Sequence, residues 1–107
     1  MRDGRFKVEI QWNAPQLGNG AGYVVPGYSN ASGNFYFFDG ENWEILVKVL
    51  DGCALNGHYW TFASAATDVG WNLTVEDTET GETWATSNTF GQRSPAITDT
   101  TAFATCP

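Results

Sequence analysis

The only histidine of this chain, His58, stands five residues after Cys53, one of its two cysteines. Thiol catalysis uses such a pair, because an imidazole can take the proton of a nearby thiol. That chemistry needs a free, activated thiolate, and a disulfide removes it. A metal site needs three or four ligands at the spacing typical of His and Cys sites, which one histidine and two distant cysteines do not supply. We therefore expect His58 to end a turn and to donate a hydrogen bond to a backbone carbonyl where a strand begins.

The two cysteines favour a disulfide. Cys53 lies in the turn-like segment "LDGCALNG", and Cys106 is next to the last residue. An even cysteine count in an exported chain favours pairing, whereas a reducing cytosol would leave two free thiols. Few lysines and many Thr, Asn and Gly residues are typical of an exported β-domain. We predict a Cys53–Cys106 disulfide that ties the C-terminal tail to this turn, with a contribution of about 4 kcal/mol to stability.

A short acidic loop is a candidate calcium site. Asp39, Glu41 and Asn42 offer side-chain oxygens within four residues, and calcium takes roughly six to eight oxygen ligands. No "DxDxDG" pattern is present. The alternative is an ordinary solvated turn, and no other cofactor is predicted.

Aromatic residues are the most informative surplus. Five Trp, four Tyr and seven Phe exceed what the core of a 107-residue chain needs. Trp12, Trp60, Phe62 and Trp71 fall on strand faces that we predict to point inward. Tyr59 is left unassigned. Five further rings are candidates for stacking on sugar rings, although such rings also cap sandwich ends or contact a neighbouring protein. These candidates are Tyr23, Tyr28, Tyr36, Trp43 and Trp84.

Alternation of apolar and polar residues predicts strands along most of the chain. Phe6, Val8, Ile10 and Trp12 alternate with polar residues, and segment 69–77 shows the same pattern. Segments 33–38, 58–66 and 84–88 also read as strands. The tail, residues 93–107, has Ile97 and Phe103 as apolar anchors and offers one short closing strand. Gly81 is placed for the left-handed position of a hairpin turn.

Three segments are less regular. Residues 13–22 are rich in Gly, Pro and Asn, which predicts a loop. Residues 23–30 predict a short strand that Pro26 confines to a sheet edge. In 39–52, Asp39 is placed to cap one helical turn, and 44–50 reads as a central strand with two mostly apolar faces. A helix over 41–50 is the weaker alternative, because β-branched residues are frequent there.

These patterns predict one all-β domain over residues 1–107. Short strands, frequent turn signals and no amphipathic helix favour an antiparallel β-sandwich of immunoglobulin-like or jelly-roll-like type. A small β-barrel is the alternative.

Charge and hydropathy limit the classes of partner and the cellular locations that we expect for this chain. The net charge of −7 repels phosphate backbones, and the five basic residues form no run, so we expect no nucleic acid partner. No apolar run is long enough for a membrane span. The opening "MRDGRF" lacks the apolar core of a signal peptide, which leaves a cytosolic protein or a secreted module cut from a longer chain. Composition favours the second, extracellular option.

Several stretches together resemble a known module. These are "GRFKVEIQW", "FYFFDGENWEILVKVLDGCALNGHYWTF", "TDVGWNLTVEDTETGE" and "DTTAFATCP". They are similar to a recurrent module at the C-termini of bacterial secreted proteins, including extracellular peptidases. The resemblance implies an exported accessory domain that accompanies a catalytic part, and it implies no activity of its own.

Three functions follow as hypotheses. The first is a non-catalytic binding module whose ligand is a polysaccharide or another cell-surface component. The second is a structural domain that packs on a partner or parent protein, or on copies of itself, through an edge strand near 23–28. The third is a small hydrolase that uses a carboxylate pair. We rank it last, because no set of acid, base and nucleophile is visible in the sequence. We therefore predict no catalytic residues.

Overall fold

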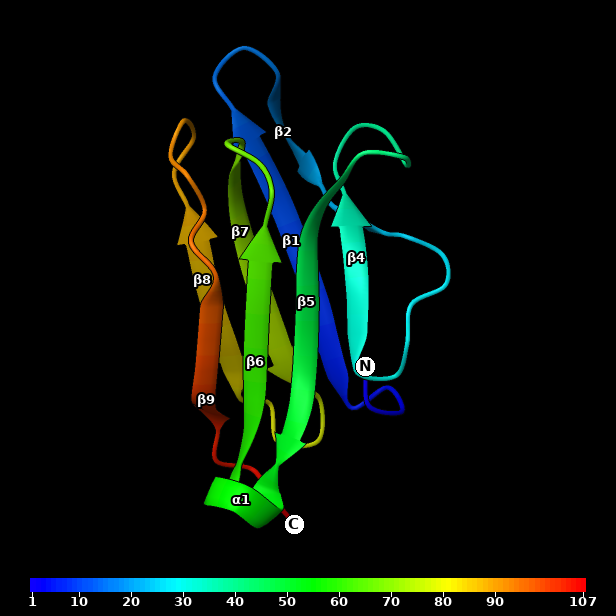
Figure 1. The fold of residues 1–107 in the computed structure, drawn as a ribbon, viewed down its shortest axis with the longest axis vertical. Coiled ribbons are helices and arrows are strands. Elements are labelled where there is room, and N and C mark those ends of the chain that lie inside the picture. Colours follow the sequence, from blue (N-terminus) through cyan, green and yellow to red (C-terminus); the bar gives the residue numbers. More distant parts are fainter.

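The computed structural model describes all 107 residues and forms two antiparallel sheets packed face to face (Figure 1). The elements are β1 (Phe6–Ala14), β2 (Gly18–Ala21), β3 (Tyr23–Val24), β4 (Ser32–Tyr36), β5 (Trp43–Gly52), α1 (Cys53–Asn56), β6 (His58–Ala65), β7 (Gly70–Asp77), β8 (Thr83–Asn88) and β9 (Ile97–Phe103). One sheet has the order β2-β1-β7-β8 and the other β3-β4-β5-β6-β9. Since no strand belongs to both sheets, the predicted β-sandwich is confirmed over the barrel.

The core lies between the sheets and is built from one face of each strand. Phe6 and Ile10 of β1 pack with Leu73 and Val75 of β7, all at most 3% exposed. Successive side chains of a strand point to opposite faces, so the alternation in the sequence places these residues inward. The inward phases predicted for β1 and β7 are confirmed, and Trp12 packs at the margin of the core.

β5 is the middle strand of its sheet, as its two apolar faces predict. Ile45, Val47 and Val49 are buried between the sheets, while Leu46 and Lys48 face outward and are half-buried. The alternative helix over 41–50 does not form. The inward face of β5 is covered by the other sheet, and its outward Leu46 and Lys48 lie beside the side chains of β4 and β6 in the same rows.

The loop predicted over 13–22 is wrong in part. β1 continues to Ala14, and Gly18–Ala21 returns beside it as β2. Gly20 lies opposite Trp12, and a Cβ at Gly20 would come within 2.7 Å of the Trp12 indole nitrogen. The glycines that suggested a loop thus leave room for a large side chain on the neighbouring strand.

β6 presents the opposite face from the one predicted. Trp60 and Phe62 are half-buried on the outer face of the sheet, and their rings stack at 6.1 Å between centroids. The inward residues are Tyr59, Thr61 and Ala63. The register decides the phase, because Thr61 lies opposite the buried Val49 of β5 and cross-strand partners share a face.

The β7–β8 hairpin and the closing strand form as the sequence pattern predicts. β7 and β8 form the predicted hairpin, and Gly81 in its turn has a φ of 79°, which favours glycine. β9 closes the five-stranded sheet beside β6. The single helix, α1, has four residues, and no helix is long and apolar enough to cross a membrane.

Candidate functional site

The outer face of the five-stranded sheet, turned toward the viewer in Figure 1, collects most of the uncommitted aromatic residues. Cross-strand partners share a face, so the register aligns its outward side chains in rows. One row contains Tyr23, Tyr36 and Trp43. The next rows are Asn34–Leu46–Ser64 and Ser32–Lys48–Phe62–Thr98.

A bulge between β4 and β5 brings Trp43 onto this face. The register shifts after Phe35, and Tyr36 pairs with Trp43. Trp43 is 54% exposed, whereas its neighbour Glu44 is only 6% exposed. An extra residue in one strand reverses the alternation locally, so the indole points outward and the Glu44 carboxyl points into the interior. Burial raises the pKa of Glu44, and one of its oxygens has no hydrogen-bond partner.

Trp43 and Tyr28 line one recess, which we call the aromatic cleft. It holds about 190 Å³. Tyr28 is 65% exposed and belongs to the loop between β3 and β4. The Trp43 indole N–H donates to the Gly40 carbonyl at 2.9 Å, which fixes the ring. The other principal lining residues are Val25, Ser29, Ser32, Asn34 and Leu46.

Polar groups also line the aromatic cleft. The Ser29 and Ser32 hydroxyls are 2.8 Å apart, and the Ser29 hydroxyl accepts the Ser32 backbone N–H at 3.0 Å. The half-buried Asn34 side chain carries both a donor and an acceptor. The cleft therefore combines apolar walls with hydrogen-bonding groups, the composition of a site for a small polar ligand.

Two more candidate rings lie next to the cleft. Tyr23 and Tyr36 pack against each other with centroids 5.6 Å apart. Tyr23 is 55% exposed, and Tyr36, half-buried, pairs with Trp43 across the β4–β5 ladder. The structure thus brings together four of the five candidate stacking residues at one edge of one face.

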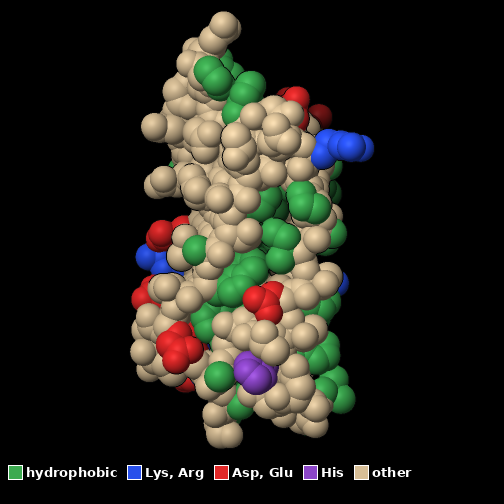
Figure 2. All heavy atoms as spheres, turned by 90° about the vertical axis from the view of Figure 1, so that its left-hand side faces the viewer, with side chains coloured by type: hydrophobic (Ala, Val, Ile, Leu, Met, Phe, Trp, Pro, Cys, Tyr) green, Lys and Arg blue, Asp and Glu red, His purple; other side chains and the backbone are tan.

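Trp84 lies apart from this group. It is half-buried on β8, packs against the core, and its indole N–H donates to Asp99 of β9 at 2.9 Å. Figure 2 faces the β8 and β9 edges and shows hydrophobic side chains in a stripe between the two sheets. The Trp84–Asp99 hydrogen bond bridges the sheets on this side, which gives Trp84 a structural role.

The acidic loop forms a tight turn. The Asp39 carboxylate accepts the Glu41 backbone N–H at 3.0 Å, and its carbonyl accepts the Asn42 N–H at 2.9 Å. All three residues are exposed. The structure contains no group of three or more His, Cys, Asp or Glu side chains arranged to hold a metal ion. The Asp39 oxygen that we predicted as a calcium ligand accepts a backbone N–H within this turn.

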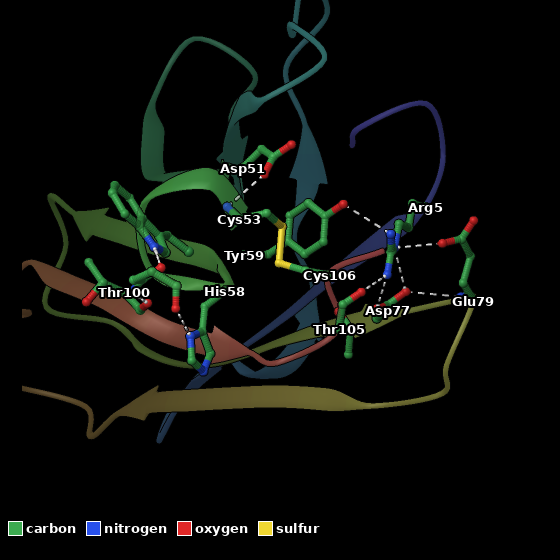
Figure 3. The surroundings of a disulfide bond; sticks show 12 residues. Arg5, Asp51, Cys53, His58, Tyr59, Asp77, Glu79, Thr100, Thr105 and Cys106 are labelled. Atoms are coloured by element: carbon green, nitrogen blue, oxygen red, sulfur yellow. Dashed lines mark hydrogen bonds and ion pairs between the residues drawn. A yellow bond between two sulfur atoms is a disulfide. The ribbon is translucent and has the colours of Figure 1, made fainter.

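The predicted Cys53–Cys106 disulfide is confirmed, with Cα atoms 5.8 Å apart (Figure 3). It joins α1 to the tail that follows β9. His58 Nδ1 lies 2.9 Å from the Asn56 carbonyl, so this nitrogen donates as predicted. Asn56 also donates to the Thr100 carbonyl at 2.7 Å. With Cys53 in a disulfide, no thiol is present for the imidazole to activate.

An ion pair beside this disulfide was missed from the sequence. Arg5 donates through two nitrogens to both carboxylate oxygens of Asp77, at 3.0 and 2.9 Å (Figure 3). It also donates to the Tyr59 hydroxyl at 3.1 Å and to the Thr105 carbonyl at 2.8 Å. The Arg5 hydrogen bonds lower the pKa of the buried Asp77 to about 2. Asp77 continues the inward phase of Leu73 and Val75, and an inward carboxylate requires a partner.

Comparison with known proteins supplies no relative: no family model, no curated protein and no solved structure matches this chain. The resemblance to an exported accessory module therefore stays a prediction.

Proposed function

We propose that this chain is a non-catalytic, extracellular carbohydrate-binding module that takes a sugar of a polysaccharide or cell-surface glycan into the aromatic cleft. The observation that carries the proposal is one recess that is lined by Tyr28 and Trp43 together with Ser29, Ser32 and Asn34. Pyranose rings present an apolar face of C–H groups ringed by hydroxyls. Aromatic walls pack on the first, and amide and hydroxyl groups bond to the second.

Two features support an extracellular accessory role. The Cys53–Cys106 disulfide persists in oxidising compartments. The most exposed large aromatic side chains, Tyr23, Tyr28 and Trp43, gather at one edge, and clustered exposed rings mark interaction sites. The chain is then a targeting domain that holds its parent or partner protein near a polymer.

The test is retention on a panel of insoluble and soluble polysaccharides, with calcium and again with chelator. We expect retention on at least one polymer, a change in tryptophan fluorescence on binding, and loss of both in Trp43→Ala and Tyr28→Ala. The matched control is Phe90→Ala, because Phe90 is an exposed ring outside the cleft, beside Ala14 and Leu17. If the chain is retained equally well in chelator, calcium bound at the Asp39 loop makes no contribution to binding. No retention by the wild-type chain on any polymer would overturn the proposal.

A second candidate is a protein-interaction or self-assembly domain. Its supporting observation is an apolar recess of about 400 Å³ beside the two-residue edge strand β3, lined by Met1, Val8, Tyr23, Val24, Tyr28 and Phe35. An edge strand presents unpaired main-chain N–H and C=O groups, which can pair with a strand of another chain. Self-assembly predicts a sedimentation coefficient that rises with protein concentration and does not respond to sugars.

A further inference from the structure

A second recess lies beside the aromatic cleft on the same outer face. It holds about 150 Å³ between β5, β6 and β9, and its lining includes Leu46, Lys48, Phe62, Ser64 and Thr98. Leu46 lines both recesses. The two recesses are therefore neighbours on the outer face of the sheet with Leu46 between them, and we call the pair of recesses the track.

The register gives the length of this track. Asn34 in the aromatic cleft, Leu46 between the recesses and Ser64 in the second recess lie opposite one another on three adjacent strands. Adjacent strands are about 4.8 Å apart, so Asn34 and Ser64 are separated by about 10 Å. One sugar ring cannot reach both recesses, whereas a short chain of linked sugars can.

The charges along the track are unusual for this protein. The chain carries 12 acidic and 5 basic residues, yet Lys48 is the only Lys, Arg, Asp or Glu in the outward rows around the two recesses. None of the three ion pairs of the structure includes Lys48. Its ammonium instead lies 5.4 Å from the centre of the Phe62 ring, on a half-buried side chain.

An unpaired cation held against an aromatic ring in a recess is suited to an anionic group. The aromatic contact positions the ammonium without neutralising it, and the neighbouring Ser64 and Thr98 hydroxyls can donate further hydrogen bonds to an oxyanion. A charge-assisted hydrogen bond from Lys48 is stronger than one between neutral groups. We propose that the second recess binds a sugar unit that carries a carboxylate or sulfate group.

This inference rests on the proposed function and specifies its ligand: an oligosaccharide chain that crosses β4, β5 and β6, with one ring in the aromatic cleft and an anionic unit at Lys48. The net charge of −7 opposes an anionic ligand at long range. At physiological ionic strength the Debye length is about 8 Å, so charges beyond the track are largely screened while a direct contact with Lys48 is retained.

The experiment measures binding of soluble oligosaccharides by calorimetry, using uronate-containing and sulfated chains beside the same chains after carboxyl reduction or desulfation. We expect the anionic form to bind about tenfold more tightly than its neutral counterpart, as one charge-assisted hydrogen bond implies. Affinity should also rise from one sugar unit to the length that fills both recesses. The carboxylate and sulfate arms show which anion is preferred.

The variants isolate Lys48. Lys48→Gln should remove the preference for the anionic form over its neutral counterpart, and Lys48→Arg should retain the preference. The matched control is Lys7→Gln, which makes the same charge change at an exposed ion pair with Glu9 on the other sheet. Binding that depends on Trp43 but ignores ligand charge and Lys48 would overturn this inference alone. If no oligosaccharide or polymer binds, the proposed function fails with it.

Discussion

The end of the sandwich that holds the disulfide and the aromatic cleft are built in opposite ways. At the first, Cys53–Cys106 and the Arg5–Asp77 ion pair join segments more than fifty residues apart, and Asp77 is fully buried. At the second, Trp43 and Tyr28 leave more than half of their surface exposed, and the Trp43 indole bonds only to Gly40 three residues away. We call the first region the cross-linked end.

This difference in side-chain bonding and exposure indicates which region of the chain is available for a ligand. Side chains at the cross-linked end are occupied by bonds that stabilise the fold, and substitutions there change the free energy of unfolding. Side chains of the aromatic cleft contribute little to the core, so their exposure has no structural explanation within the chain. Stability and ligand binding should therefore respond to separate sets of substitutions.

The largest expected effect on stability comes from the disulfide. Replacing both cysteines, Cys53→Ser with Cys106→Ser, frees a loop with a sequence separation of 53 residues. We expect a loss of about 4 kcal/mol, because the unfolded chain regains the entropy that the cross-link removes. Urea denaturation of the variant, and of the wild-type chain with and without reductant, measures this loss. Wild-type and variant affinities for the same glycan should agree wherever both are folded, and a parallel loss of affinity would break the comparison.

The second effect concerns the buried ion pair. Asp77→Asn removes the buried carboxylate, and Arg5, whose side chain is 14% exposed, keeps only the largely exposed Glu79 carboxylate at 3.0 Å as a charged partner. We expect a loss of about 3 kcal/mol at neutral pH, as for other buried pairs that lose one member. Denaturant titration of the wild type and the variant at pH 7 gives this value.

The pH dependence of the Arg5–Asp77 pair follows from the direction in which the pKa of Asp77 is shifted. The pKa of Asp77 falls from an ordinary value of 3.8 to about 2 in the folded chain, chiefly through hydrogen bonds from Arg5. A lowered folded pKa adds stability above the unfolded pKa, and this contribution is lost as the pH falls from about 4 to about 2. The stability difference between the wild type and Asp77→Asn should therefore shrink across that interval. A difference that stays constant down to pH 2 would contradict the assigned pKa.

Trp84→Phe is expected to have a smaller effect. The variant keeps an aromatic ring on β8 but loses the N–H that donates to Asp99. A hydrogen bond to a charged group contributes about 2 kcal/mol, which the variant should lose without a change in glycan binding. Trp43→Phe is the matched control, because the indole N–H of Trp43 donates only to an exposed carbonyl. The stability of this variant should differ from that of the wild type by less than about 0.5 kcal/mol. Loss of glycan binding in Trp84→Phe would return Trp84 to the ligand-binding candidates.

Much of the fold was predictable because alternation and turn residues act locally. The inward phases of β1 and β7, the hairpin at Gly81 and the central position of β5 all follow from patterns within ten residues. The face of β6 did not follow, because the largest apolar rings, Trp60 and Phe62, belong to the outward phase, whereas the inward phase includes the smaller Thr61 and Ala63. Only the pairing of Thr61 with Val49 selects one phase, and that pairing is long-range information.

The candidate site was predictable in its residue types and not in its assembly. The aromatic surplus indicated Tyr23, Tyr28, Tyr36 and Trp43, but their common location depends on the register of three strands. The sequence alone could not separate Trp84 from the others, since its partner Asp99 lies in another sheet. The sequence pattern does not distinguish Lys48 from the other basic residues, because only the folded sheet shows that its ammonium has no ion-pair partner.

The bulge that turns Trp43 outward provides the smallest and last prediction. It also buries the Glu44 carboxylate, with one oxygen unpartnered, and burial raises its pKa. A raised folded pKa means that ionised Glu44 destabilises the chain at neutral pH, and that this cost disappears as the pH falls through the folded pKa toward 4.5. Glu44→Gln removes the charge, so we expect it to be more stable than the wild type by about 1 kcal/mol at pH 7.

That advantage of Glu44→Gln should vanish below pH 4.5. Thermal unfolding at both pH values measures it, and Glu41→Gln, an exposed carboxyl three residues earlier, is the matched control. Trp43 should keep its outward position in Glu44→Gln, and glycan affinity should be unchanged, because the bulge is fixed by the ladder and not by the carboxylate. Equal stability of wild type and variant at pH 7 would mean that the buried carboxylate finds a compensating partner. A loss of affinity would instead show that the buried side of the bulge supports the aromatic cleft.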